Sequence, residues 1–108
     1  MTRQYLLGEL SVRLGDLESV ATGQEQRQLA GQLRRDAERM PAGCLGNLIW
    51  QGLRLGEEAC QGALESGDWP EFLQRMAVCS SLWEFGVCSG LIDSEVTPGA
   101  PGDAHKPF

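Results

Sequence analysis

The sequence contains one histidine, one lysine and seven aromatic residues in 108 positions, and these shortages exclude several classes of function. The single histidine is His105, inside a Pro- and Gly-rich segment, so neither a histidine metal site nor a Cys-His or Ser-His catalytic pair is expected. None of the four cysteines belongs to a Cys-x-x-Cys motif, and no glycine-rich loop follows a strand pattern. We therefore expect a protein that is not an enzyme and that has no metal and no cofactor.

Long apolar runs are also missing. No stretch approaches the ~18 consecutive apolar residues of a membrane-spanning helix, and Glu9 and Arg13 interrupt any signal-peptide core near the N-terminus. The expected compartment is therefore the cytoplasm. Eight arginines against one lysine, with abundant Gly, Ala and Leu, are typical of a GC-rich bacterial genome.

The charge is unevenly distributed. The formal net charge is −6, and residues 55–108 hold nine acidic side chains against only Arg75 and Lys106, whereas residues 1–54 are nearly balanced. Because an acidic surface repels phosphate groups, we expect neither nucleic acid nor an anionic membrane surface as a partner.

Apolar periodicity and breaking residues predict an all-α fold, an antiparallel bundle of four helices. We expect one helical domain over residues 1–92 and a disordered Pro- and Gly-rich tail over residues 93–108. Pro41 should stop the second helix, and Asp68 with Glu71 forms an acidic capping box that should open the fourth. The four helices are expected at residues 3–20, 24–40, 45–65 and 69–91.

The fourth predicted helix is apolar over most of its circumference, so several elements must cover it. One line of side chains on it consists of Phe72, Met76, Cys79 and Trp83, and a second line consists of Val78, Leu82 and Phe85. The other helices offer little surface to cover both lines. We therefore expect a small interaction or regulatory protein that forms a homodimer, with its interface at Trp50, Val78, Leu82 and Phe85.

A small apolar ligand inside the bundle is the alternative. The candidate pocket residues are Phe72, Met76, Cys79 and Trp83, with Gly52 and Gly56 as the floor, since glycines on one helix make room for rings on the next. The same residues would equally make an ordinary packed core.

The cysteines are expected to be structural. Cys79 and Cys88 should point to opposite sides of their helix, so they cannot form a disulfide with each other. Cys44, Cys60 and Cys79 are expected to be small buried apolar groups, and Cys88 to be exposed but inert.

One short motif invites a comparison. Trp50, Gln51 and Gly52 form a Trp-x-Gly triplet in the middle of a chain of about 100 residues, which resembles the WXG100 family of proteins exported by bacterial type VII secretion. The resemblance implies a two-helix hairpin with the triplet in its turn and an aromatic-x-x-x-acid export signal near the C-terminus. Here the triplet falls within an amphipathic pattern, and the Tyr-x-x-x-Glu match, Tyr5 to Glu9, is at the opposite end.

Overall fold

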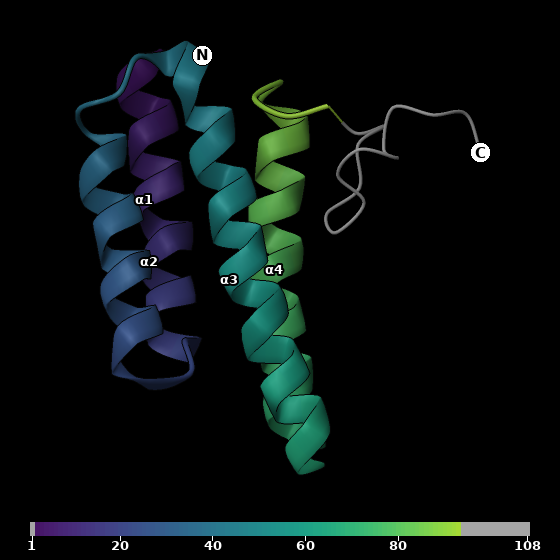
Figure 1. Ribbon diagram of the computed structural model, residues 1–108. Coiled ribbons are helices and arrows are strands. Elements are labelled where there is room, and N and C mark those ends of the chain that lie inside the picture. Colours follow the sequence, from purple (N-terminus) through teal and green to yellow (C-terminus); the bar gives the residue numbers. More distant parts are fainter. Residues whose placement is uncertain (1, 94–108) are drawn as a thin grey trace.

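The computed structural model describes residues 2–93, which form four α-helices, a short 3-10 turn and no strand (Figure 1). The helices are α1 (Arg3–Val20), α2 (Gly23–Ala37), α3 (Leu45–Ser66) and α4 (Trp69–Cys88), and the turn Ala42–Cys44 precedes α3. The predicted all-α, four-helix architecture is therefore confirmed. The predicted disordered tail lies outside the described residues, except for Asp93.

The first two helices form an antiparallel pair. Thr2 caps α1 by accepting a hydrogen bond from the Tyr5 amide at 3.1 Å. One leucine seam of α1 is almost completely buried and consists of Leu6, Leu10, Leu14 and Leu17. From α2, Ala30, Leu33 and Ala37 face the same core, and an ion pair between Arg34 and Glu18, 3.1 Å apart, joins the two helices at the surface.

The second helix ends at Ala37, three residues before the predicted end at Met40. Residues 38–40 leave the helical path ahead of Pro41, which restricts the conformation of the residue before it. The Arg3 guanidinium donates to the carbonyl oxygens of Glu38 and Met40, at 3.0 and 2.9 Å. These two bonds attach the end of α2 to the start of α1.

The other two helices form a longer hairpin that extends past the connection between α1 and α2, at the bottom of Figure 1. Gly67, with φ of +73°, makes the turn between them. Asp68 then accepts a hydrogen bond from the Glu71 amide at 3.2 Å, so the predicted opening of the fourth helix is confirmed. Leu48, Ile49 and Leu53 of α3 and Leu82 of α4 face α1 and α2 and complete the core.

The fourth helix ends at Cys88 rather than at the predicted Leu91. Gly90 adopts a φ of +78°, and the amides of Leu91 and Ile92 both donate to the Gly86 carbonyl, at 3.0 and 3.1 Å. This left-handed turn folds Ile92 back against Gly86 of α4, and the Ile92 side chain is only 7 % exposed.

The small residues of α3 receive different neighbours from those expected. Leucine methyl groups of Leu14, Leu17 and Leu82 lie where a Gly52 side chain would begin, and the Cys79 thiol lies against Gly56. The rings of Phe72 and Trp83, which were expected beside these glycines, are not among the nearest neighbours of either one. The reason is that the side of α4 with Leu82 and Phe85 packs toward α1, whereas the side with Phe72 and Met76 does not.

Candidate functional site

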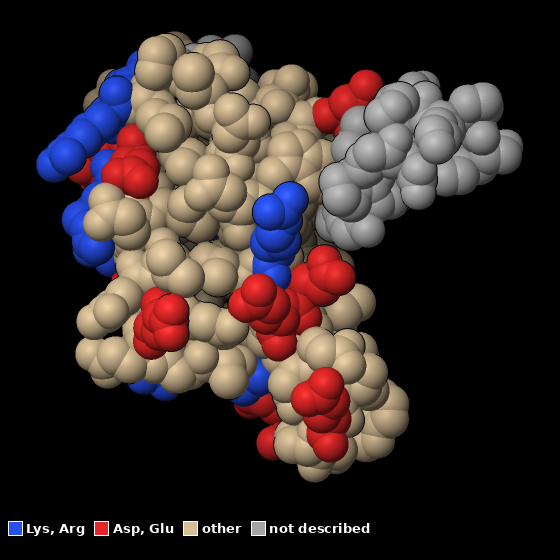
Figure 2. All heavy atoms as spheres, viewed as in Figure 1, with Lys and Arg blue, Asp and Glu red and all other residues tan. Residues whose placement is uncertain are grey.

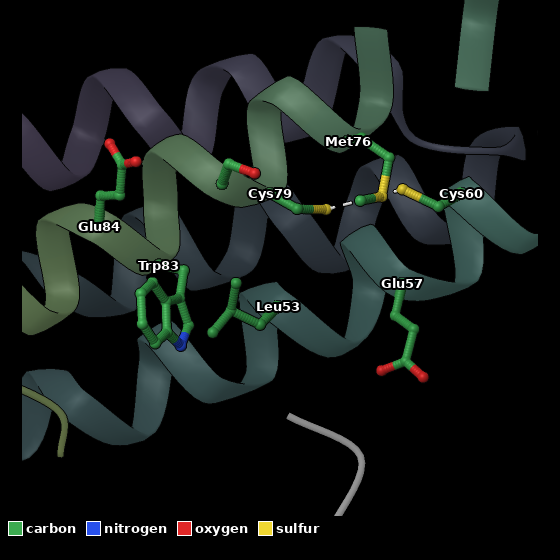
Figure 3. A pocket seen from close by; sticks show the side chains of 8 residues that line it. Leu53, Glu57, Cys60, Met76, Cys79, Trp83 and Glu84 are labelled. Carbon is green, nitrogen blue, oxygen red and sulfur yellow. Dashed lines mark hydrogen bonds between the residues drawn. The ribbon is translucent and has the colours of Figure 1, made fainter. Parts of the chain in front are cut away.

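An open groove runs between α3 and α4 on the side of the hairpin that faces away from α1 and α2 (Figure 3). Its volume is about 570 Å³ and its lining is mainly apolar. The helix α3 contributes Leu53, Glu57 and Cys60, and α4 contributes Met76, Cys79, Ser80, Trp83 and Glu84. Two carboxylates, one on each helix, are therefore the charged groups at an otherwise apolar and sulfur-rich surface.

The two groove cysteines are in contact. The Sγ atoms of Cys60 and Cys79 are 3.9 Å apart, so one thiol donates to the other across the helix pair (Figure 3). The pKa of Cys79 is raised to about 12, mainly by burial and to a lesser extent by the neighbouring Cys60 and the Glu57 carboxylate. Burial also raises the pKa of Cys60, although Cys79 and the Arg75 guanidinium act against this. Both thiols are protonated at neutral pH and are poor nucleophiles.

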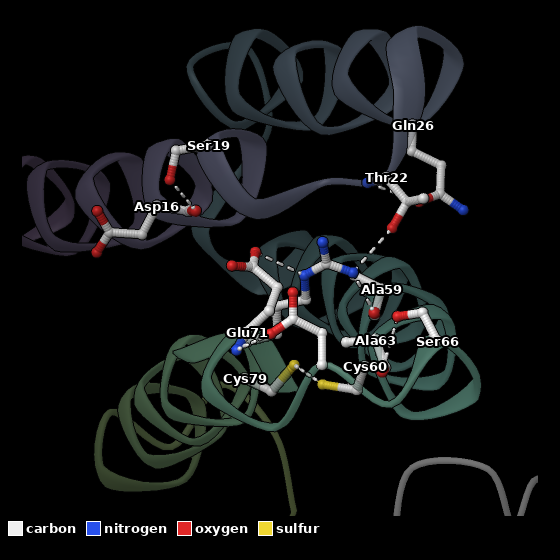
Figure 4. Close-up of polar contacts among 12 residues, drawn as sticks. Asp16, Ser19, Thr22, Gln26, Ala59, Cys60, Ala63, Ser66, Glu71 and Cys79 are labelled. Atoms are coloured by element: carbon white, nitrogen blue, oxygen red, sulfur yellow. Dashed lines mark hydrogen bonds and ion pairs between the residues drawn. The ribbon is translucent and has the colours of Figure 1, made fainter. Parts of the chain in front are cut away.

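Arg75 joins the hairpin to the rest of the chain through three acceptor residues, Glu71, Ala59 and Thr22, which are labelled in Figure 4. Its guanidinium binds the Glu71 carboxylate at 3.0 Å, the Ala59 carbonyl of α3 at 2.6 Å and the Thr22 hydroxyl at 3.3 Å. Thr22 belongs to the connection between α1 and α2, so a single side chain joins three parts of the fold. Because these bonds use its donors, Arg75 serves structure in this arrangement.

The apolar surface continues beyond the groove toward the hairpin turn. Leu64, Trp69, Leu73 and Met76 are 43 to 63 % exposed. On α3, Leu64 follows Cys60 by one turn, and on α4, Leu73 and Trp69 precede Met76 by one and two turns, so these side chains extend the groove's own faces. We call the groove together with Leu64, Trp69 and Leu73 the hairpin face.

Two of the four predicted interface residues are buried in the core of the chain. Leu82 is 1 % exposed and Phe85 is 8 % exposed, and both belong to the core cluster. Arg13 covers the outer side of the Phe85 ring, 4.8 Å from its centroid. Trp50 and Val78 are partly buried and pack against the same core. The second apolar line of α4 is therefore covered by this chain's own helices, and no partner is needed to bury it.

Three of the four predicted pocket residues line the groove: Met76, Cys79 and Trp83. The fourth, Phe72, instead meets Trp69 edge to face, with ring centroids 5.6 Å apart. The predicted floor is partly present, because Gly56 lies against Cys79, whereas Gly52 is covered by leucines of the core. The pocket is thus an open groove on the surface and not a cavity inside the bundle.

Sequence reasoning missed Cys60 as the partner of Cys79, and it placed Cys44 in the core although the structure exposes it. The two thiols are 19 residues apart on different helices, so no spacing rule connects them. The hairpin turn gave no signal either, because Cys60 lies seven residues before Gly67 and Cys79 twelve after it, and these distances from the turn do not match. The structure also places Trp50 and Gly52 within α3, not in the turn that the WXG100 resemblance implies.

Classical metal and membrane sites are not found in the described part of the chain. Residues 2–93 contain no group of three or more His, Cys, Asp or Glu side chains that could hold a metal ion. Over the same residues, no helix combines the length and the apolar character needed to cross a bilayer.

Comparisons with known proteins give no relative. No protein-family model, no curated protein and no solved structure matches this chain. Functional inference therefore has to start from the hairpin face itself.

Proposed function

We propose that this chain is a cytoplasmic bacterial protein that acts by association with another protein, and that its hairpin face binds one amphipathic helix of that partner. The observation that carries the proposal is the continuity of the groove with the exposed side chains near the turn. From Trp69 to Trp83 this face follows α4 over 15 residues, a rise of about 21 Å, which suits a partner helix of about four turns.

The exposure of these side chains supports a docking surface. Trp69 is 59 % exposed and Leu73 is 63 % exposed. Large apolar side chains that gather at one end of a small domain are typical of interaction surfaces, and tryptophan is enriched at the centres of such surfaces.

Charge indicates the chemistry of the partner. Glu57 and Glu84 border the groove, and the hairpin carries further acids at its turn end, with Arg75 already engaged by Glu71. In Figure 2, acidic side chains lie over the protruding end of the hairpin and beside one basic side chain near the middle of the view; further basic side chains, together with some acidic ones, lie along the left edge, over α2. A partner helix with arginine or lysine beside its apolar stripe would complement this face.

The same charges argue against a symmetric homodimer through this surface. A two-fold axis would place the acidic hairpin of one copy against that of the other. The homodimer expected from the sequence is therefore the competing occupant, and the solution mass of the purified protein separates the two cases.

The test uses two synthetic 16-residue helical peptides with the same leucine stripe, one flanked by lysine and the other by glutamate. We expect the lysine peptide to bind the monomeric chain and to change its tryptophan fluorescence, with at least about tenfold weaker binding by the glutamate peptide. Leu73→Glu should weaken binding of the lysine peptide by about tenfold or more, because it places a charge within the apolar contact.

Val12→Glu is the matched control, because Val12 is 60 % exposed but lies on α1. Equal binding of the two peptides, or equal effects of the two substitutions, would refute the proposal. A micromolar wild-type dimer that Leu73→Glu converts into a folded monomer would instead show that a second copy occupies the face.

A small apolar ligand is the second candidate. The groove volume of about 570 Å³ is within the range of ligand sites, and the buried indole N–H of Trp83 has no acceptor among the described residues. An acceptor group on a ligand would satisfy it. Denaturing mass spectrometry of purified protein should then detect a co-purifying compound that Met76→Glu removes, and a protein free of any compound would count against this candidate.

A further inference from the structure

Three sulfur-containing side chains line the groove. The Sγ atoms of Cys60 and Cys79 are 3.9 Å apart, and Met76 lines the same surface from α4. In the view of Figure 3, the Met76 side chain overlaps the line that joins the two thiols. Two thiols and a thioether are a soft ligand set, which selects soft metal ions.

We propose that Cys60, Cys79 and Met76 form a binding site for one soft monovalent metal ion, of which Cu(I) is the biological representative. This inference goes beyond the association proposed above and rests on the sulfur cluster alone. The two thiols and the ion give a bis-thiolate complex and two protons, with the Met76 thioether as the neutral third ligand. No electron is transferred.

The spacing of the thiols fits a shared ion. With metal–sulfur bonds of about 2.3 Å, a separation of 3.9 Å gives a sulfur–metal–sulfur angle of about 116°, close to the trigonal value. A disulfide would instead need the sulfur atoms to approach by about 1.9 Å, to a bond of about 2.0 Å. The site does not suit Zn²⁺, which takes four ligands, because residues 2–93 contain no group of three or more His, Cys, Asp or Glu side chains that could hold a metal ion.

Packing holds one of the ligands in place. The Cys79 Sγ occupies the space in which a Gly56 Cβ would lie, so the thiol rests directly on α3. The Glu57 carboxylate lines the same groove and raises the pKa of both thiols, so it opposes the loss of their protons. Arg75 is the nearby cation, and it is bound to Glu71 and to the Ala59 carbonyl.

The experiment is an anaerobic titration of the reduced full chain with Cu(I) in competition with a chromogenic Cu(I) chelator. Cys44 and Cys88 are exposed, so both are first changed to serine to remove competing thiols. We expect one ion per chain, and because two protons leave, an affinity that rises by up to about a hundredfold per pH unit near neutrality.

Single substitutions in that background test the ligands. Cys60→Ser and Cys79→Ser should each lower the affinity by roughly a hundredfold or more, and Met76→Leu by roughly tenfold. Met40→Leu is the matched thioether control, since Met40 lies outside the groove, and it should change nothing. Met76 is 43 % exposed, so its substitution leaves the fold intact, as the far-ultraviolet circular dichroism should confirm.

Retention of the ion by the Cys60→Ser variant, or an affinity that does not change with pH, would overturn the proposal. An unchanged affinity in the Met76→Leu variant would show that the thioether is not a ligand, and would refute the three-ligand site. Met76→Leu keeps the hairpin face apolar, so it should still bind the lysine peptide. Loss of the metal site and loss of the association surface are therefore distinguishable.

Discussion

Gly56 is a residue whose missing side chain determines the packing of its neighbours. The Cys79 Sγ lies in the space of a Gly56 Cβ, and a methyl group of Leu17 would be 3.4 Å from that atom. Glycine costs about 1 kcal/mol relative to alanine in a helix interior. At this position the cost is offset by the close approach of α3 to α4 and to α1.

Gly56→Ala should therefore destabilise the protein by about 1–3 kcal/mol, because the added methyl group overpacks the contact with Cys79. Gly62→Ala is the matched control in the same helix: the nearest atoms to its Cβ would be 3.8 and 3.9 Å away, so the helix propensity of alanine should stabilise the protein by about 0.5–1 kcal/mol. Urea denaturation measures both. Stabilisation by both substitutions would show that α4 is free to shift away from α3.

The two groove thiols should make stability depend on alkaline pH. The pKa of Cys60 and Cys79 is raised in the folded state, for Cys79 from 9.0 to about 12, so the unfolded chain loses these protons first. The contribution to stability is complete below pH 9 and is lost as the pH rises from 9 toward 12. Denaturant midpoints should fall over this range, and they should fall less steeply in a Cys79→Ala variant. Parallel curves for the two proteins would contradict the assignment.

At the scale of the elements, the start of α4 is set by residues near it in the sequence, whereas its direction is set by contacts with residues far from it in the sequence. Asp68 caps its first turn through the Glu71 amide, and Glu71 in turn binds Arg75, which reaches Ala59 and Thr22. The start of α4 is thus built from residues within eight positions of each other. Its direction relative to α3 and to the connection between α1 and α2 depends on the Arg75 bonds.

Asp68→Ala should cost about 1 kcal/mol, because the Glu71 amide loses its acceptor at the helix start. Asp68→Asn should cost much less, since asparagine is an equally good N-cap. Thermal unfolding followed by circular dichroism compares the two variants. If alanine and asparagine had the same effect, the carboxylate would act by its charge and not as a hydrogen-bond acceptor.

At the scale of the whole molecule, one chain covers the apolar line of α4 that the sequence assigned to a dimer interface. Leu82 and Phe85 pack with leucines of α1 and α3, and Arg13 also donates to the Ser81 carbonyl at 3.3 Å. The other side of α4, which forms part of the hairpin face, is not covered by the rest of the chain. A surface of this kind is where an association function would act.

Phe85→Glu should therefore unfold the chain and not separate a dimer, because it places a carboxylate in the core where Phe85 is 8 % exposed. Leu73→Glu, at a position that is 63 % exposed, should keep the native helix content. Circular dichroism and light scattering on a gel-filtration column check both variants. A folded, monomeric Phe85→Glu protein derived from a wild-type dimer would restore the interface expected from the sequence.

The sequence by itself determined the helices, because their limits depend on nearby residues. The Asp68 cap is such a local feature, and it is found where it was predicted. The predicted α2 and α4 each extended three residues too far. In the structure, the chain bends at residues 38–40 before Pro41, and Gly90 with its positive φ follows the end of α4, so both helices end before their last apolar side chain.

Only the tertiary structure decided which side of α4 is buried. Because α4 is apolar on several sides, its periodicity gives no direction, and the choice between the line of Leu82 and Phe85 and the line of Met76 and Trp83 depends on how well each fits the surface of α1 and α3. The leucine seam of α1 accepts Leu82 beside Gly52, which leaves Met76 exposed and Trp83 only partly buried at the edge of the core. The same choice brings Cys79 to Cys60 across the hairpin, a contact between residues far apart in the sequence that no local pattern encodes.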